Sequence, residues 1–135
     1  MFKTLKRFSL ADLAQQMVGG FLLAGPFVVT EEVWRLAENL DWYHPILTVL
    51  IVFGIGYGAL YEADEERDAD KEAEIGGIPL RFLSLLFVTY ISVSVLIFVF
   101  GANVTFNASL WTVFKVISIA SIFSVIGAAT ADSVF

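Results

Sequence analysis

The sequence contains no cysteine, one histidine and few charged residues, and each shortage excludes a class of protein. Without cysteine the chain forms no disulfide and offers no thiolate as a metal ligand or nucleophile. Charged residues make up 16% of the 135 residues, well below the roughly 25% that is typical of soluble domains. Hydrophobic residues make up 58%, more than a soluble domain of this size can bury. The composition therefore favours an integral membrane protein.

Motifs for catalysis and for nucleic-acid binding are also missing. The chain has no nucleophile elbow, no Walker loop and no dinucleotide-binding pattern. Its lone histidine, His44, has no evident partners for a metal site. No basic patch is present that would release counterions from nucleic-acid phosphates. We therefore expect a protein that is not an enzyme, carries no cofactor and binds no nucleic acid.

Four apolar stretches are long enough to cross the hydrocarbon core as helices, which takes about 20 residues each. They cover residues 11–29, 45–61, 80–101 and 108–131. The first stretch is too long for a signal peptide and no small-residue cleavage site follows it, so we expect it in the mature protein. The sequence predicts a single all-α domain, residues 1–135, with four transmembrane helices in a lipid bilayer.

Basic residues in the connecting segments predict the orientation. Arg35 lies alone on one side of the spans, and the other side carries six basic residues: Lys3, Lys6, Arg7, Arg67, Lys71 and Arg81. The side that is richer in lysine and arginine stays in the cytoplasm. Both termini are therefore expected inside the cell, in a multi-pass protein of the cell membrane.

The first span is interrupted by glycine and proline. Residues 19–34 read GGFLLAGPFVVTEEVW, in which Gly25 and Pro26 precede two adjacent carboxylates. A break in a helix frees backbone groups that only neighbouring protein or water can satisfy inside lipid. The two carboxylates, Glu31 and Glu32, are either solvated residues of the interface or acids at a pore mouth, where they would concentrate cations.

Lys115 is the charged residue that lies deepest in the fourth span, about a turn and a half from its outer end. Snorkelling past Trp111 into the headgroups would explain it. An ion pair with Glu31 or Glu32 would also explain it, and would tie the first and fourth spans together. We favour the ion pair, either as a structural tie or as a constriction that selects ions by charge.

Small residues mark the expected helix contacts. Gly54 and Gly58 form a GxxxG pair in the second span, and Ser118, Ser121 and Ser124 follow one another at three-residue steps in the fourth. Small side chains let helix backbones approach closely in lipid. These residues predict packing within the bundle or between protomers, and the lining of a hydrated path is the alternative.

Three charged residues lie at the cytoplasmic ends of the spans. Asp12 begins the first span, where a carboxylate favours the positive pole of the helix. Asp132 ends the fourth span, at the unfavourable pole, so it needs water or a basic partner. Arg81, which begins the third span, and the N-terminal bases are the candidate partners. A structural latch between helix ends is the expected role.

The net charge of −6 is concentrated in the cytoplasmic loop 62–75, where eight acids face Arg67 and Lys71. We expect this loop to extend the second helix until Gly76 and Gly77 stop it. It lacks the pattern of an EF-hand, so a solvated, self-repelling face is the default interpretation. Closely spaced carboxylates also suit hard cations, and the weak candidates for such a site are Asp68, Asp70 and Glu72.

Three segments together resemble a known family: GGFLLAGPFVVTEEVWRLAENL, GIGYGALY and VISIASIFSVIGAATAD. This family comprises small prokaryotic integral membrane proteins of unknown function, numbered 2391 among the uncharacterised domains. Its signature is the broken first span followed by T-x-E-V-W, here Thr30, Glu32, Val33 and Trp34. The resemblance covers nearly the whole chain and implies a polytopic membrane fold, without an activity to transfer. The chain departs from the family by its dense acidic loop and by ending soon after the fourth span.

These features predict a small ion channel or transporter that works as a homo-oligomer, with cations favoured. The broken span, the outer acids, Lys115 and the hydroxyl stripe motivate this hypothesis. Four short helices have little interior of their own, so the small-residue faces suggest contacts between protomers. The alternative is a non-conducting assembly or sensing module that uses the acidic loop as a docking or ion-sensing surface.

Overall fold

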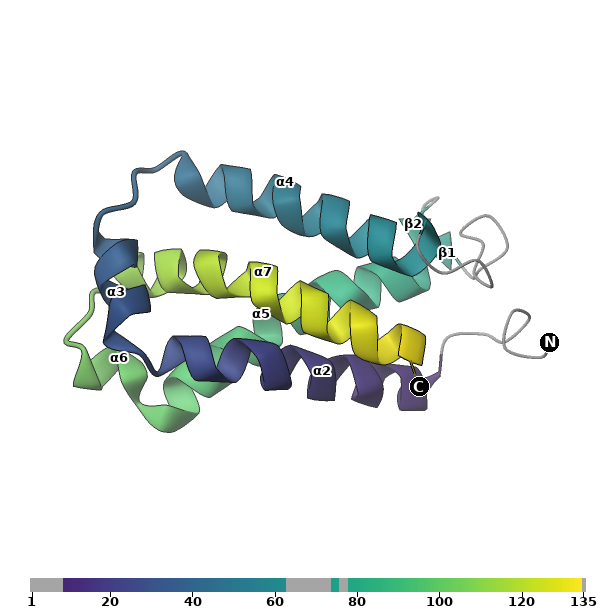
Figure 1. The fold of residues 1–135 in the computed structure, drawn as a ribbon, viewed down its shortest axis with the longest axis horizontal. Coiled ribbons are helices and arrows are strands. Elements are labelled where there is room, and N and C mark those ends of the chain that lie inside the picture. Colours follow the sequence, from purple (N-terminus) through teal and green to yellow (C-terminus); the bar gives the residue numbers. More distant parts are fainter. Residues whose placement is uncertain (1–8, 63–73, 76–77, 135) are drawn as a thin grey trace.

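The computed structural model describes residues 9–62, 74–75 and 78–134, and its long helices run along one common direction (Figure 1). The elements in chain order are α2 (Leu10–Val28), α3 (Glu31–Glu38), α4 (His44–Tyr57), the π-helical turn η1 (Gly58–Glu62), β1 (Glu74–Ile75), β2 (Ile78–Pro79), α5 (Leu80–Phe100), α6 (Ala102–Thr105) and α7 (Leu110–Val134). The short helices α3 and α6 lie at one end of the bundle, called the α3 end here (Figure 1). At the opposite end, called the terminal end, α2 begins and α7 finishes.

The described residues contain three helices that are long and apolar enough to cross a membrane: His44–Tyr61, Leu80–Phe100 and Leu110–Asp132. The helices α2 and α3 pass the same test together, although a bend of 79° separates them. The chain thus has four spans if this bent pair counts as one. The ends of α2 and of these three candidate spans fall within two residues of the predicted ranges. The predicted all-α, multi-span membrane fold is confirmed, and the pair β1–β2 is a small addition to it.

The local sequence explains where α2 begins and ends. The Ser9 hydroxyl accepts the backbone N–H of Asp12 at 3.3 Å, and the Asp12 carboxylate accepts the N–H of Ser9 at 3.0 Å, which is a capping box. The helix then runs without interruption through Gly25 and Pro26 and ends at Val28. Proline removes one N–H and crowds the preceding turn. The break predicted for the first span therefore lies just after the proline, and the glycines stay inside the helix.

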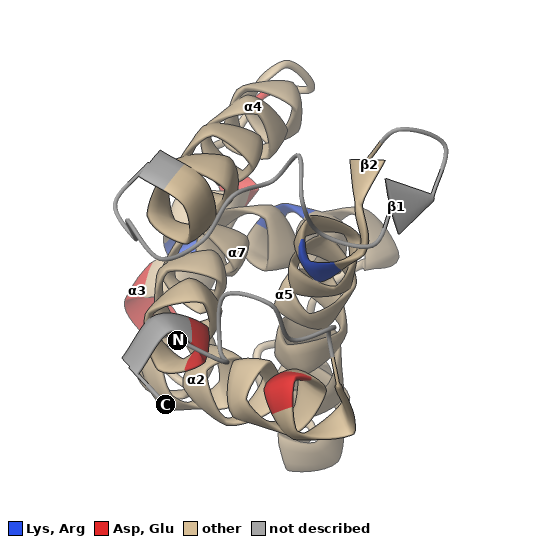
Figure 2. Cartoon of the chain, turned by 90° about the vertical axis from the view of Figure 1, so that its right-hand side faces the viewer, with Lys and Arg blue, Asp and Glu red and all other residues tan. Residues whose placement is uncertain are grey.

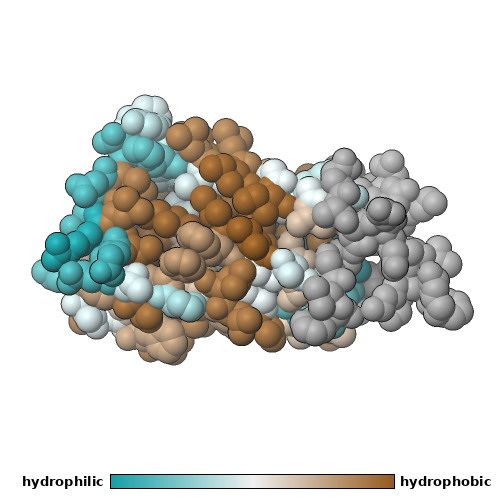
Figure 3. Space-filling model, viewed as in Figure 1, coloured by the Kyte–Doolittle hydropathy of each residue, from teal (hydrophilic) through white to brown (hydrophobic). Residues whose placement is uncertain are grey.

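The surface of the bundle is apolar around its middle. Leu22, Leu50 and Phe87, from three different helices, expose 64–69% of their surface. Figure 3 shows an apolar band across the middle of the visible face and a hydrophilic region at the α3 end. Inside, α7 is the central helix, with 67% of its spanning window buried against 28% for α4. Such an outward-facing belt is suited to lipid rather than to water.

The prediction that the second helix extends through the acidic loop is wrong at Glu74 and Ile75, at the end of the loop. The turn η1 ends at Glu62, and Glu74–Ile75 forms a strand that pairs antiparallel with Ile78–Pro79. Isoleucines on both sides of a glycine pair favour a hairpin over a helix, because β-branched residues suit strands and glycine suits tight turns. The weak cation-site candidates Asp68, Asp70 and Glu72 lie outside the described residues.

Helices α2 and α7 touch at Gly19 and Gly127. A Cβ atom placed on either glycine would overlap the backbone carbonyl group of the other. Only glycine therefore fits on the two sides of this contact, and the absence of side chains lets the two backbones meet. Because α7 is the central helix, this contact fixes the position of α2 in the bundle.

Gly127→Ala should destabilise the protein, because the added methyl group must push α2 and α7 apart. Overpacking of this kind costs about 1–3 kcal/mol. Gly25→Ala is the matched control on α2, since its Cβ would lie 3.7 Å from Leu96 Cδ1, an ordinary contact. Thermal unfolding in detergent should rank Gly127→Ala well below wild type and Gly25→Ala close to it. Equal melting temperatures for the two variants would contradict the contact.

Candidate functional site

At the terminal end, one arginine binds carboxylates from two other helices. Arg81 lies in the first turn of α5, and its Nη1 is 2.7 Å from Asp132 Oδ1 on α7. Its Nη2 is 3.2 Å from Asp12 Oδ2 on α2. The side chains of Arg81 and Asp132 are 6% and 0% exposed, and that of Asp12 is 22% exposed. The three residues predicted to lie at this end thus come together and join three helices.

Two neutral side chains complete this group. Gln16 Nε2 donates to Asp132 Oδ2 at 3.1 Å, and Ser84 Oγ donates to Gln16 Oε1 at 2.7 Å. Each oxygen of Asp132 therefore accepts a hydrogen bond. Gln16 does not stand out in the sequence, although its position four residues after Asp12 places both side chains on one face of α2. We call these residues the arginine cluster: Asp12, Gln16, Arg81, Ser84 and Asp132.

The arginine cluster is costly to disturb because it lies among apolar helices. Charged residues are few on the long helices, as Figure 2 shows. Few other charged groups could therefore replace a partner that the cluster lost. When one member of a buried ion pair is removed, the other is left unpaired, at a cost of about 3–5 kcal/mol. The cluster therefore acts as a latch between α2, α5 and α7.

Lys115 lies near the α3 end and is 5% exposed. Its Nζ donates to the carbonyl oxygen of Leu40 at 3.1 Å and lies 5.5 Å from the centroid of the Trp111 ring. Leu40 follows the C-terminal end of α3, where the helix dipole is negative and a lysine is favoured. The ammonium group thus binds a carbonyl group just beyond the C-terminal end of α3.

The prediction of an ion pair between Lys115 and Glu31 or Glu32 is wrong. Both glutamates are exposed in the first turn of α3, and Glu31 pairs with Arg35 at 3.0 Å. The 79° bend explains the difference. The bend turns α3 out of the line of α2, and Lys115 binds the Leu40 carbonyl group, beyond the opposite end of α3 from these acids.

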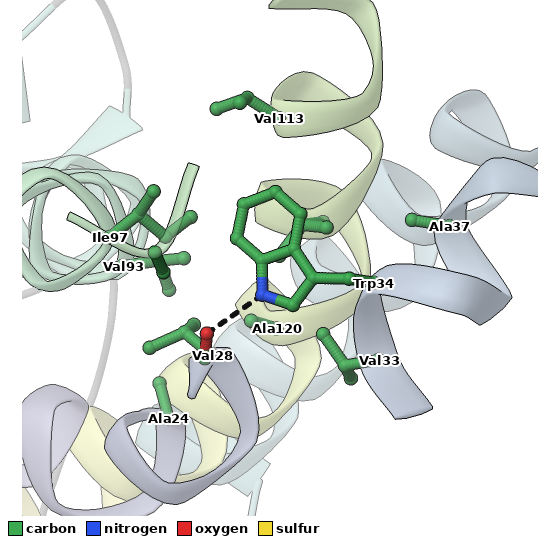
Figure 4. Packing of buried hydrophobic residues seen from close by; sticks show 11 residues of the cluster. Ala24, Val28, Val33, Trp34, Ala37, Val93, Ile97, Val113 and Ala120 are labelled. Carbon is green, nitrogen blue, oxygen red and sulfur yellow. Dashed lines mark hydrogen bonds between the residues drawn. The ribbon is translucent and has the colours of Figure 1, made fainter. Parts of the chain in front are cut away.

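The bend itself is stabilised by hydrogen bonds to the freed carbonyl groups of α2. Trp34 Nε1 donates to the carbonyl oxygen of Val28 at 2.8 Å, as Figure 4 shows. Thr30 Oγ1 donates to the carbonyl oxygen of Phe27 at 2.9 Å. A buried indole N–H usually finds a partner, and here the indole is 2% exposed within an apolar cluster. Two residues of the T-x-E-V-W signature thus supply donors to the last carbonyl groups of α2 where the span bends.

An open cavity of about 520 Å³ lies at the α3 end, between α3 and the segment that joins α6 to α7. Its wall is formed by Glu31, Trp34, Arg35, Glu38, Asn39, Thr105, Phe106 and Asn107. Two of its charged residues, Glu31 and Arg35, pair with each other and expose 58% and 74% of their side chains. The cavity therefore offers solvated polar surface and not a buried binding site.

The serines predicted to pack or line a path lie in the protein interior. Ser118 Oγ donates to the Phe114 carbonyl oxygen at 3.0 Å and Ser121 Oγ to the Ser118 carbonyl oxygen at 2.6 Å. Ser124 is fully buried, and its hydroxyl has no hydrogen-bond partner among the described residues. Hydroxyls commonly satisfy carbonyl groups of their own helix in this way, so Ser118 and Ser121 alone do not indicate a path.

The predicted glycines have different surroundings in the structure. A Cβ on Gly54 or Gly58 would meet nothing within 4 Å, so these two positions of α4 and η1 have open space beside them. A Cβ on Gly25 would make an ordinary contact with Leu96 on α5, and Pro26 is exposed. Within residues 9–62, 74–75 and 78–134, no three histidine or acidic side chains gather into a metal-binding group.

Trp34→Phe should lower the stability of the protein, because the Val28 carbonyl group loses its donor in apolar surroundings. An unsatisfied buried acceptor costs about 1–3 kcal/mol. Trp42→Phe is the control, since Trp42 is 70% exposed. Melting temperatures in detergent should fall for Trp34→Phe and stay near wild type for Trp42→Phe. A Trp34→Phe variant that melts with the control would show that the bend does not depend on this hydrogen bond.

The comparison with protein families agrees with this architecture. The model of the family described as "Putative integral membrane protein (DUF2391)" matches residues 3–134. No curated protein and no solved structure matches the chain. The match covers almost all of the sequence, including the bent first span and the arginine cluster. The protein is therefore a member of the DUF2391 family of integral membrane proteins.

Proposed function

We propose that this protein carries small cations across the membrane as a homo-oligomer, with the arginine cluster as its charged element. The observation that supports this is a fully buried carboxylate, Asp132, inside a helical membrane domain. Ionisable residues are expensive inside a membrane, and by default they indicate a pathway or an ion-binding site.

The carboxylates of the cluster favour cations. Asp12 and Asp132 both contribute oxygen atoms to it, and hard cations prefer oxygen ligands. The 22% exposed side chain of Asp12 gives a cation an approach to one of these carboxylates.

The acids at the α3 end have a smaller role in this proposal. Glu31 is paired with Arg35, and Glu31 and Glu32 are both exposed. They can raise the local concentration of cations near the membrane surface. They do not form a charge-selective constriction with Lys115, whose ammonium binds the Leu40 carbonyl group.

The proposed orientation places both termini in the cytoplasm of a prokaryotic cell, with the protein in the cell membrane. The lysine and arginine residues of the connecting segments support it, since six of them lie on the terminal side and Arg35 alone on the other. In this orientation the arginine cluster faces the cytoplasm and α3 lies at the outer surface.

Protomer contacts are proposed along α4, at Gly54 and Gly58. Both positions have open space where a side chain would be, and neighbouring Leu50 is 64% exposed. In lipid, small residues at four-residue spacing let a second helix approach closely. A second copy of α4 would fit this face.

Flux measurements in proteoliposomes test the transport proposal. Wild-type protein should move small cations down their gradients. Asp12→Asn removes the approachable carboxylate, and a loss of about 1.4 kcal/mol of cation affinity would lower binding about tenfold. Ser9→Ala is the matched control, because it removes the capping hydroxyl but keeps the charge of Asp12, and Glu32→Gln tests an exposed acid. Both controls should transport at the wild-type rate. Absence of cation flux, or full flux with Asp12→Asn, would contradict the proposal.

Replacing the α4 glycines tests the oligomer. Gly54→Leu and Gly58→Leu place bulk in open space, so the protomer should fold while close approach of a second α4 is prevented. Native mass spectrometry from detergent should show a shift toward monomer. Val99→Leu, at an exposed position on α5, is the control and should keep the wild-type assembly. A wild-type protein that is monomeric throughout would rule out this interface.

The second candidate is a non-conducting assembly or sensing module. The direct contact between Gly19 and Gly127, which closes the space between α2 and α7, favours it. In this case the acidic loop would be the docking or ion-sensing surface. Deletion of residues 64–74 would then abolish partner binding, whereas a conducting protein should keep its flux.

A further inference from the structure

We infer that the cation carried is the proton, which passes along buried hydroxyl groups where α2, α5 and α7 meet. This inference rests on the proposed transport function and names its substrate. It comes from the middle of the bundle, between the arginine cluster and Lys115.

The helices α2, α5 and α7 approach one another closely near Gly20. A Cβ on Gly20 would lie 2.9 Å from both Ser92 Oγ on α5 and Ser124 Oγ on α7. One residue earlier, the backbones of α2 and α7 are in contact at Gly19 and Gly127. Two hydroxyl groups from different helices therefore flank a glycine at which a methyl group would fit only if the serine side chains moved.

These groups would coordinate a metal cation poorly. Selectivity filters replace the hydration shell of an ion by rings of oxygen atoms. Here the oxygens are few, and the hydroxyls of Ser118, Ser121 and Thr89 are engaged with carbonyl groups of their own helices. Ser92 donates to the sulfur of Met17 at 3.7 Å. A proton needs neither a shell of ligands nor a wide passage.

Two buried hydroxyl groups are available to relay a proton. Ser124 Oγ and Tyr90 Oη are both buried, and within the described part of the chain neither has a hydrogen-bond partner of good geometry. Tyr90 Oη lies beside the Ser121 side chain. Buried hydroxyls without partners are uncommon in proteins. Each can donate one hydrogen and accept two, which is the property that a relay requires.

These hydroxyls lie between the two charged regions of the interior. Ser124, Ser121 and Ser118 follow one another along α7 with a rise of about 4.5 Å per step, toward Lys115. In the other direction, Gln16 of the arginine cluster lies about 6 Å along α2 from Gly20. The arginine cluster brings Asp12, Arg81 and Asp132 to the terminal end of this route.

The transfer is balanced at each oxygen. An incoming proton binds a lone pair of a hydroxyl oxygen as that hydroxyl releases its own proton to the next acceptor. One O–H bond forms and one breaks at each step, and every hydroxyl finishes with a single hydrogen. The net result is the movement of one proton and one positive charge.

Proteoliposomes with a trapped pH-sensitive dye provide the test. A pH gradient is imposed with valinomycin and potassium present to balance charge, and sodium and potassium fluxes are measured in parallel without the ionophore. Ser124→Ala and Tyr90→Phe remove the two available hydroxyls with little change of shape. Ser94→Ala is the matched control on α5, because Ser94 donates to the Tyr90 carbonyl group and lies outside the route.

Proton flux without sodium or potassium flux, lowered several-fold by Ser124→Ala or Tyr90→Phe and unchanged by Ser94→Ala, is the expected result. Sodium or potassium flux without proton flux would overturn the inference and leave the transport proposal standing. Proton flux that neither variant lowers would overturn the route. Absence of every flux would overturn the inference and the transport proposal together.

Discussion

The pairing of Arg81 with Asp132 is the interaction on which the bundle most depends, because in apolar surroundings neither charge is tolerated alone. The guanidinium reaches from α5 to α7 and also to Asp12 on α2. Gln16 binds the second oxygen of Asp132, so the carboxylate is satisfied on both sides. Three helices that share no chain connection at this end are thereby joined by polar contacts, while Gly19 and Gly127 join two of them by direct backbone contact.

Polar groups at the α3 end also need partners. The bend after Pro26 leaves carbonyl groups at the end of α2 without the donors that a continuing helix would supply. Thr30 and Trp34 donate to two of them, and Lys115 binds the Leu40 carbonyl group beyond the far end of α3. The short helix is therefore attached at both ends, and it covers the apolar cluster around Trp34.

The sequence was sufficient to predict the spans, because length and apolar composition alone decide whether a helix can cross lipid. It was insufficient for the partner of Lys115, since no local pattern reports a 79° bend that rotates Glu31 and Glu32 away. The sequence pattern of the glycines was equally uninformative. Gly54 and Gly58 look like a packing motif, yet it is Gly19 and Gly127 at which two helix backbones meet inside the protomer. Which glycines meet depends on the tertiary arrangement. Arg81 and Asp132 were easier to pair, because both lie at the same end of neighbouring spans.

The central claim is that the chain crosses a bilayer four times, with α2 and α3 forming one bent span, and single-cysteine labelling tests it most directly. The natural sequence has no cysteine, so Ser9→Cys, Glu32→Cys and Asn107→Cys each give one exposed thiol. In right-side-out vesicles, a membrane-impermeant maleimide should label Glu32→Cys and Asn107→Cys at once, and Ser9→Cys only after permeabilisation. Labelling of Ser9→Cys and Asn107→Cys from the same side would contradict this topology and the account built on it.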